Sequence, residues 1–194
     1  MKTVFFDVDT QIDFLYPAGA LYAPGAEAIV ERVAALNRHA FAHGIPVIST
    51  MDAHSENDPE FERFPPHCVG GTAGQQKPAS TLYEKPMVIP NSPCDPAVEG
   101  ARQILLEKQT LDCFEQVNLA ALLAKLDAER YIVYGVVTEI CVKFAAFGLL
   151  KTGKRVELVT DAVRPLDKAA GARTLAEFSG QGGILSDAAS VLGG

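Results

Sequence analysis

The sequence has no excess of positive charge, no long apolar run and no dense set of cysteines. Its 17 lysines and arginines against 24 acidic residues give a net charge of −7, which argues against nucleic acid and anionic membrane as partners. No apolar stretch approaches the roughly 20 residues of a membrane span. Asp7 interrupts the first apolar residues before a signal-peptide core forms. Four cysteines without CxxC spacing favour a reduced, cytoplasmic protein.

Internal repeats, low-complexity tracts and linkers are also missing, so nothing divides the chain. A chain of 194 residues with 48% hydrophobic content can bury one sizeable core. We therefore expect a single domain over residues 1–194.

Strand and helix patterns alternate along the chain, which predicts an α/β fold with a parallel sheet. Short apolar runs predict strands at 4–8, 47–51, 103–107, 131–137 and 155–160. Apolar residues at helical spacing predict helices at 26–42, at 118–126, from 141 onward and, after a cap at Asp167, through 178. Residues 182–192 are expected to form a short edge strand or turn and a frayed tail.

Side chains capable of chemistry follow four of the predicted strands. Asp9, Asp52, Lys108 and Cys141 each lie just past a strand end. In open parallel sheets such groups gather beyond the carboxyl ends of the strands. We expect these four side chains to converge at one edge of the sheet.

Cys141 lies between the buried strand at 131–137 and the helix that follows it. A helix N-terminus favours a thiolate, and its free N–H groups can bind an oxyanion. Taken alone, the residue favours the alternative, a small cysteine that packs under the sheet. The convergence of other reactive groups shifts the interpretation toward a nucleophile.

The chemistry of a nucleophilic amidase would suit three of these side chains: Asp9, Lys108 and Cys141. The Cys141 thiolate attacks a carbonyl carbon and forms a thioester, while Asp9 accepts the thiol proton and later passes it to ammonia. Lys108 stabilises the charged pair and is expected to lower the pKa of Asp9. No histidine is placed to act as the base.

The segment 52–90 is long, polar and rich in proline and glycine, as functional loops often are. Asp52 and His54 are two residues apart, so in an extended chain they point the same way. With Glu60 and His67 they form a plausible site for zinc, iron or manganese. The alternative is a polar surface loop that happens to hold two of the four histidines.

Five segments, in order along nearly the whole chain, resemble motifs of the isochorismatase-like cysteine hydrolase superfamily, and most closely its nicotinamidase branch. They are DTQIDF at 9–14, MDAH at 51–54, PPHCVGGTAG at 65–74, LEKQTLDCF at 106–114 and GVVTEICV at 135–142. Two departures stand out: Thr10-Gln11-Ile12 replaces the more usual Val-Gln-Asn, and Phe64 stands where nicotinamidases often have tryptophan.

The resemblance implies a doubly wound, mostly parallel sheet with helices on both faces. It implies that Asp9, Lys108 and Cys141 form a catalytic triad that hydrolyses nicotinamide to nicotinic acid and ammonia, a reaction of NAD salvage. The alternative is a related hydrolase acting on another small amide, such as a ureido or carbamoyl compound. Because this fold commonly assembles, a homo-oligomer is also implied.

The resemblance further implies that Asp52, His54 and His67 bind one divalent metal ion, with zinc ahead of iron and manganese. Glu60 is the fourth candidate ligand. The ion would bind the pyridine nitrogen and so orient the ring. The flat ring would lie between aromatic side chains, although these are equally consistent with ordinary core residues: Phe14 and Phe64.

A cis peptide between Val137 and Thr138 is the last feature that the resemblance implies. It would turn the backbone N–H of Thr138 toward the oxyanion, beside that of Cys141.

Overall fold

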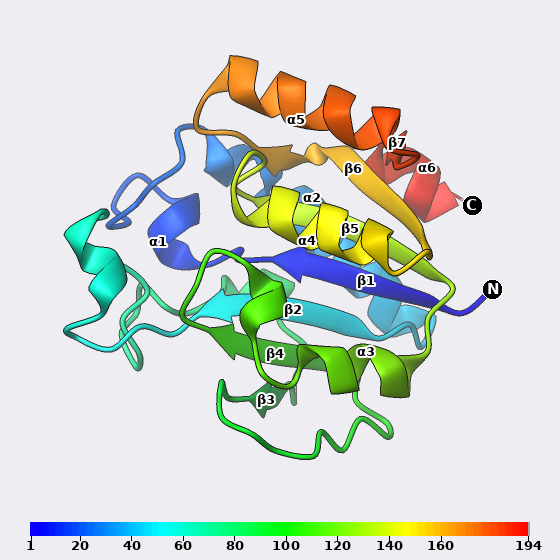
Figure 1. The fold of residues 1–194 in the computed structure, drawn as a ribbon, viewed down its shortest axis with the longest axis horizontal. Coiled ribbons are helices and arrows are strands. Elements are labelled where there is room, and N and C mark those ends of the chain that lie inside the picture. Colours follow the sequence, from blue (N-terminus) through cyan, green and yellow to red (C-terminus); the bar gives the residue numbers. More distant parts are fainter. Residues whose placement is uncertain (194) are drawn as a thin grey trace.

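The structure, a computed structural model, describes residues 1–193 and contains one seven-stranded sheet (Figure 1). All neighbouring strands are parallel, in the order β3-β4-β2-β1-β5-β6-β7. The strands are β1 (Thr3–Val8), β2 (Val47–Asp52), β3 (Met87–Ile89), β4 (Gln103–Lys108), β5 (Arg130–Val136), β6 (Arg155–Arg164) and β7 (Ile184–Ser186). The chain first builds the sheet to one side of β1 and then returns to the other side. The predicted doubly wound parallel architecture is confirmed.

Helices cover both faces of the sheet (Figure 1). One face carries α2 (Val30–Ala42) and α6 (Ala188–Gly193), and the other carries α3 (Leu119–Leu126), α4 (Cys141–Lys151) and α5 (Lys168–Gly180). The short helix α1 (Ile12–Leu15) lies beyond the carboxyl end of β1. Single 3₁₀ turns are η1 (Ala26–Ile29), η2 (Pro59–Glu62), η3 (Ala79–Thr81) and η4 (Cys113–Glu115). No helix within residues 1–193 combines the length and apolar character needed to cross a membrane.

Two segments differ from the sequence-based expectation. The helix predicted at 26–42 begins as a 3₁₀ turn and becomes α-helical at Val30. The short edge strand expected after residue 182 is β7, but the expected frayed tail is the helix α6, because Ala188 and Val191 bury their side chains against the face that α2 covers. The N–H of Ala188 also donates to the Asp161 carboxylate, 2.8 Å away, which anchors the start of α6.

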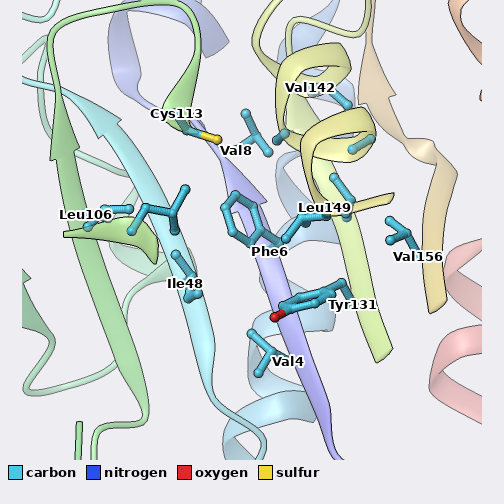
Figure 2. Close-up of a cluster of buried hydrophobic side chains, with 14 of the residues drawn as sticks. Val4, Phe6, Val8, Ile48, Leu106, Cys113, Tyr131, Val142, Leu149 and Val156 are labelled. Carbon is cyan, nitrogen blue, oxygen red and sulfur yellow. The ribbon is translucent and has the colours of Figure 1, made fainter. Parts of the chain in front are cut away.

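The strand side chains alternate between two apolar cores. Figure 2 shows Phe6 and Val8 of β1 beneath Val142 and Leu149 of α4, all fully buried. Phe5 points to the opposite face and packs in the core under α2. Each such side chain contributes roughly 1.5–3 kcal/mol on burial. This double packing fixes β1 and β5 at the centre of the sheet.

Gly135 allows β5 to approach β1 closely just before the chain reaches Cys141. Its φ is +124°, and a Cβ there would lie 2.1 Å from the carbonyl oxygen of Val8. Only glycine fits this position. The glycine that interrupts the apolar run of β5 therefore brings the segment leading to Cys141 beside the end of β1.

Candidate active site

Asp52 and Lys108 are register partners at the carboxyl ends of β2 and β4. The buried Lys108 ammonium contacts Asp52 Oδ1, lies 2.9 Å from Asp9 Oδ2 and donates to the carbonyl of Thr110 at 3.1 Å. Burial alone would lower the pKa of Lys108, but the carboxylates of Asp52 and Asp9 outweigh it and raise the pKa well above its usual range. Lys108 is thus a fixed cation between two buried carboxylates.

Asp9 follows β1 and takes a left-handed backbone conformation, φ 48°, which aspartate tolerates better than most residues. Its Oδ1 accepts a hydrogen bond of 2.6 Å from the Thr50 hydroxyl. Burial raises the pKa of Asp9, and the neighbouring Asp52 adds to the rise, while Lys108 and Thr50 oppose it. Lys108 does lower the pKa of Asp9, as expected, but complete burial outweighs the ammonium and the net shift is upward.

Cys141 is the first residue of α4, and its thiol lies close enough to Asp9 for that carboxylate to raise its pKa. Burial raises the pKa of Cys141 well above its usual range; Asp9 and Asp52 add to the rise and Lys108 opposes it. The expected resting thiolate was therefore wrong. The raised pKa favours the protonated thiol, and the nearby carboxylate of Asp9 is the candidate acceptor of its proton.

The backbone before Cys141 differs from what the resemblance implied. The cis peptide joins Val136 to Val137, one bond earlier than expected. The N–H of Thr138 donates to the carbonyl of Arg164 at 3.0 Å and is not free to bind an oxyanion. Among the hydrogen bonds of residues 1–193, neither the N–H of Val137 nor that of Cys141 donates to a protein acceptor. These two N–H groups are the better candidates.

Three side chains beside Lys108 form a metal-type cluster: Asp52, His54 and His67. All three are buried, and their donor atoms lie within 4.8 Å of one another. Oδ2 of Asp52 is 3.8 Å from Nε2 of His54 and 3.9 Å from Nε2 of His67. Ligands that share an ion at about 2.0–2.2 Å lie about 3–4 Å apart. Since neither ring nitrogen of His54 has a hydrogen-bond partner among the described residues, the donor set fits a divalent ion.

Glu60, the fourth candidate ligand, lies at the rim of this cluster. Its Oε1 is 3.9 Å from Nε2 of His67. Burial, then the charge of Asp52, raises the pKa of Glu60. Only this distance to His67 is of the length found between two ligands of one ion, and the group whose donor atoms all lie within 4.8 Å of one another leaves Glu60 out.

A short parallel bridge brings the two histidines together across 13 residues of chain. The N–H of His54 donates to the carbonyl of Cys68 at 3.2 Å, and the N–H of Gly70 donates to the carbonyl of His54 at 2.9 Å. The N–H of the buried Cys68 in turn donates to Asp13 at 2.7 Å. Cys68 is thus a backbone anchor of the loop, and its thiol, whose pKa burial raises, packs in the core.

A cavity opens over the thiol of Cys141 and the metal-type cluster. Its lining includes Asp52, Glu60, His67 and Cys141, and no lysine or arginine. The rest of the lining is apolar: Phe14, Leu21, Phe64, Leu111, Val136, Val137, Ile140 and Leu166. The rings of Phe14 and Phe64 lie 5.4 Å and 6.3 Å from the ring of His67, so the two predicted aromatic residues do border the same space.

Gln11 has a part in this site that the sequence did not reveal. Its fully buried carboxamide accepts from the N–H of Asp52 at 2.7 Å and donates to the carbonyl of Asp52 at 2.8 Å and that of Gln75 at 2.9 Å. It therefore fixes the backbone of the carboxylate that contacts both Lys108 and the histidines. Its place inside the DTQIDF motif was the only available signal.

Comparison with known proteins agrees with this geometry. The protein-family model described as Isochorismatase domain matches residues 3–190. The maleamate amidohydrolase of Pseudomonas putida is 27% identical over 165 residues, covering 84% of this chain and 72% of that protein.

Two solved structures share the fold over nearly their whole length. The pyrazinamidase of Pyrococcus horikoshii, in complex with zinc, has a TM-score of 0.82 at 27% identity, covering 96% of this chain and 99% of its own. The pyrazinamidase/nicotinamidase of Streptococcus mutans has a TM-score of 0.81 at 25% identity, covering 95% and 99%. The chain belongs to the isochorismatase family, and within it resembles the nicotinamidase and pyrazinamidase branch.

Proposed function

We propose that this protein is a cysteine amidohydrolase that converts nicotinamide to nicotinic acid and ammonia through a thioester. One observation carries the proposal: a cysteine thiol lines the cavity near the lysine-bound carboxylate of Asp9 and beside three metal-type side chains. The resemblance to a pyrazinamidase and to a pyrazinamidase/nicotinamidase supports an aromatic carboxamide as the substrate.

The residues suggest a balanced two-step reaction. The Cys141 thiol gives its proton to Asp9 as sulfur attacks the amide carbon, and Asp9 then passes that proton to the departing nitrogen, which leaves as ammonia. Water next attacks the thioester, loses a proton to Asp9, and Asp9 returns a proton to the cysteine sulfur. The raised pKa of Asp9 suits a group that must hold this proton between steps. Lys108 keeps the carboxylate in place.

For the oxyanion, we propose the backbone N–H groups of Val137 and Cys141 in place of the expected pair of Thr138 and Cys141. The N–H of Cys141 stands at the N-terminus of an 11-residue helix, where the helix dipole favours negative charge. Both residues line the cavity over the thiol.

Asp52, His54 and His67, with Glu60 as the fourth candidate, are proposed to hold one divalent metal ion. When bound, the ion supplies a Lewis acid for the pyridine nitrogen. Zinc is the first choice because the pyrazinamidase with the same fold was solved with zinc, and iron and manganese suit the same donors. The amide end of the ring would then face Cys141, while Phe14 and Phe64 border its faces.

The cavity lining favours a neutral heteroaromatic amide. The relative from Pseudomonas putida makes a second substrate class, small aliphatic amides, worth testing. Maleamate carries a carboxylate, and among the described residues the lining of this cavity includes no lysine or arginine. The same argument weighs against carbamoyl compounds that bear a carboxylate. Cytoplasmic location, a role in NAD salvage and a homo-oligomeric state stay predictions from the sequence.

The direct experiment is to incubate the purified, zinc-supplemented protein with nicotinamide and to measure ammonia and nicotinic acid. We expect both products in equal amounts, with at least a thousandfold lower rate for Cys141→Ala. Rapid turnover of maleamate without turnover of nicotinamide would favour the second class instead.

A further inference from the structure

The carboxylate of Asp58 lies directly behind His54, on the side away from the other metal-type donors. Oδ2 of Asp58 is 3.0 Å from Nδ1 of His54, while Nε2 of the same ring faces Asp52. The His54 side chain is fully buried and that of Asp58 is 9% exposed. Solvent therefore does little to weaken this contact.

The turn around Asp58 is built to hold its carboxylate in place. The N–H of Asp58 donates to the carbonyl of Ser55 at 3.2 Å. Oδ1 of Asp58 accepts from the N–H of Glu60 at 2.9 Å, which caps the 3₁₀ turn η2. One side chain thus contacts both a metal-type histidine and the backbone of the fourth candidate ligand.

His67 shows the same arrangement with a different partner. Nδ1 of His67 is 2.8 Å from the carbonyl oxygen of Pro65, and its Nε2 faces Asp52. Both imidazoles therefore have an oxygen atom within 3.0 Å of Nδ1, of which the His67 contact alone meets hydrogen-bond geometry here, and both direct Nε2 toward Asp52. A neutral imidazole with its proton on Nδ1 has its lone pair on Nε2, as a metal ligand requires.

We propose that Asp58 is a positioning residue of the metal site. It accepts the Nδ1 proton of His54 and so fixes the ring with the Nε2 lone pair toward the ion. The inference rests on the metal site of the proposed function and is independent of which amide is hydrolysed.

The test is a zinc affinity, measured on metal-stripped protein by competition with a chromophoric chelator. Asp58→Asn keeps the size of the side chain and an oxygen for the Glu60 N–H, so η2 remains capped. We expect zinc binding about 10–100-fold weaker than in the wild type. Asp58→Ala should weaken it at least as much. Glu62→Gln removes an exposed carboxylate from the same turn and should change the affinity less than about twofold.

Two further measurements separate positioning from a general effect on folding. The thermal midpoint of metal-free Asp58→Asn should stay within about 2 °C of wild type, because asparagine keeps the size of the side chain and the cap of η2. In a His54→Ala background, Asp58→Asn should cause no further loss of zinc affinity, because its effect acts through that ring. Three results would each overturn the proposal. The first is a zinc affinity of Asp58→Asn equal to that of the wild type, and the second is a loss of zinc affinity in the His54→Ala background as large as in the wild-type background. The third is a wild-type protein that binds no zinc. If Asp58→Asn weakens zinc binding as expected but the wild-type protein does not hydrolyse nicotinamide, only the proposed substrate is refuted.

Discussion

Lys108 and Asp9 come from strands that are not neighbours, yet the ammonium of Lys108 lies 2.9 Å from Oδ2 of Asp9. Lys108 reaches across β2, whose last residue, Asp52, it also contacts. Two buried carboxylates therefore share one buried cation. Removing any one of the three charges changes the balance for the other two.

Replacing Lys108 by methionine is expected to lower both activity and stability. Two buried carboxylates would then face each other without a cation, and breaking a buried pair in this way costs about 3–5 kcal/mol of unfolding free energy. We expect amidase kcat/KM to fall at least a hundredfold. The control is Lys125→Met, which removes an exposed ion pair with Asp95 and should cost no more than about 1 kcal/mol. Equal unfolding free energies for the two variants in urea would contradict this account.

Asp9→Asn should separate activity from stability. Because burial raises the pKa of Asp9, the carboxyl group binds its proton more tightly in the folded than in the unfolded protein. Its stabilising contribution is present below the unfolded pKa, near 4, and is lost as pH rises through the folded value. At pH 7 the neutral asparagine should leave the unfolding free energy unchanged or higher, while activity falls at least a thousandfold.

The same comparison at several pH values checks the sign. The stability of Asp9→Asn relative to wild type should increase as pH rises from 4 to 7. A relative stability that falls over this range would mean that the folded protein prefers the ionised carboxylate.

Alkylation of Cys141 reports the state of its thiol. Since burial raises its pKa, the rate of reaction with iodoacetamide should increase about tenfold per pH unit between pH 7 and 9. The exposed Cys94 would react as an ordinary thiol, so the measurement uses a Cys94→Ser background. A rate that is already constant below pH 7 would restore the thiolate that the sequence suggested.

Removal of the metal should lower kcat/KM most for substrates that carry a ring nitrogen. After chelation we expect kcat/KM for nicotinamide to fall at least about tenfold and to return with zinc or manganese. Benzamide has a ring of the same size without the nitrogen. We expect it to be hydrolysed more slowly than nicotinamide, and chelation should lower its kcat/KM by a smaller factor. The preference for nicotinamide over benzamide therefore reports on the metal. A preference unchanged by chelation would place the ion elsewhere.

Substitution of Phe64 tests whether its ring contacts the substrate in the cavity. Phe64→Ala should raise KM for nicotinamide about threefold to tenfold, in line with the loss of roughly 0.5–1.5 kcal/mol from an aromatic contact. Phe144→Ala is the matched control, since Phe144 is 41% exposed on α4 and lies outside this cavity. An equal rise in KM for both variants would remove Phe64 from the substrate site.

Strand-end reasoning predicted the convergence of the site. Asp52 and Lys108 are register partners, and Asp9 and Cys141 follow the two central strands, so their proximity follows from sheet order alone. The spacing of Asp52 and His54 made the metal-type cluster one of two open interpretations, and the resemblance favoured it over a polar surface loop.

Features that depend on tertiary surroundings could not be predicted. The candidate oxyanion N–H belongs to Val137 and not to Thr138 as expected. The reason is that β6 extends to Arg164, whose carbonyl accepts from the N–H of Thr138. The pKa directions of Asp9 and Cys141 depend on complete burial, which motif spacing does not show. The acceptors behind the histidines were missed for the same reason: Asp58 contacts His54 only once the loop turns back.

The central claim is that the sulfur of Cys141 bonds to the substrate carbon. Acid quenching of wild-type protein during turnover of nicotinamide, followed by peptide mass spectrometry, measures this directly. We expect a nicotinoyl group on the peptide that contains Cys141 and on no peptide containing Cys68, Cys94 or Cys113. Ammonia release by Cys141→Ala at the wild-type rate, or an adduct on another cysteine, would contradict it.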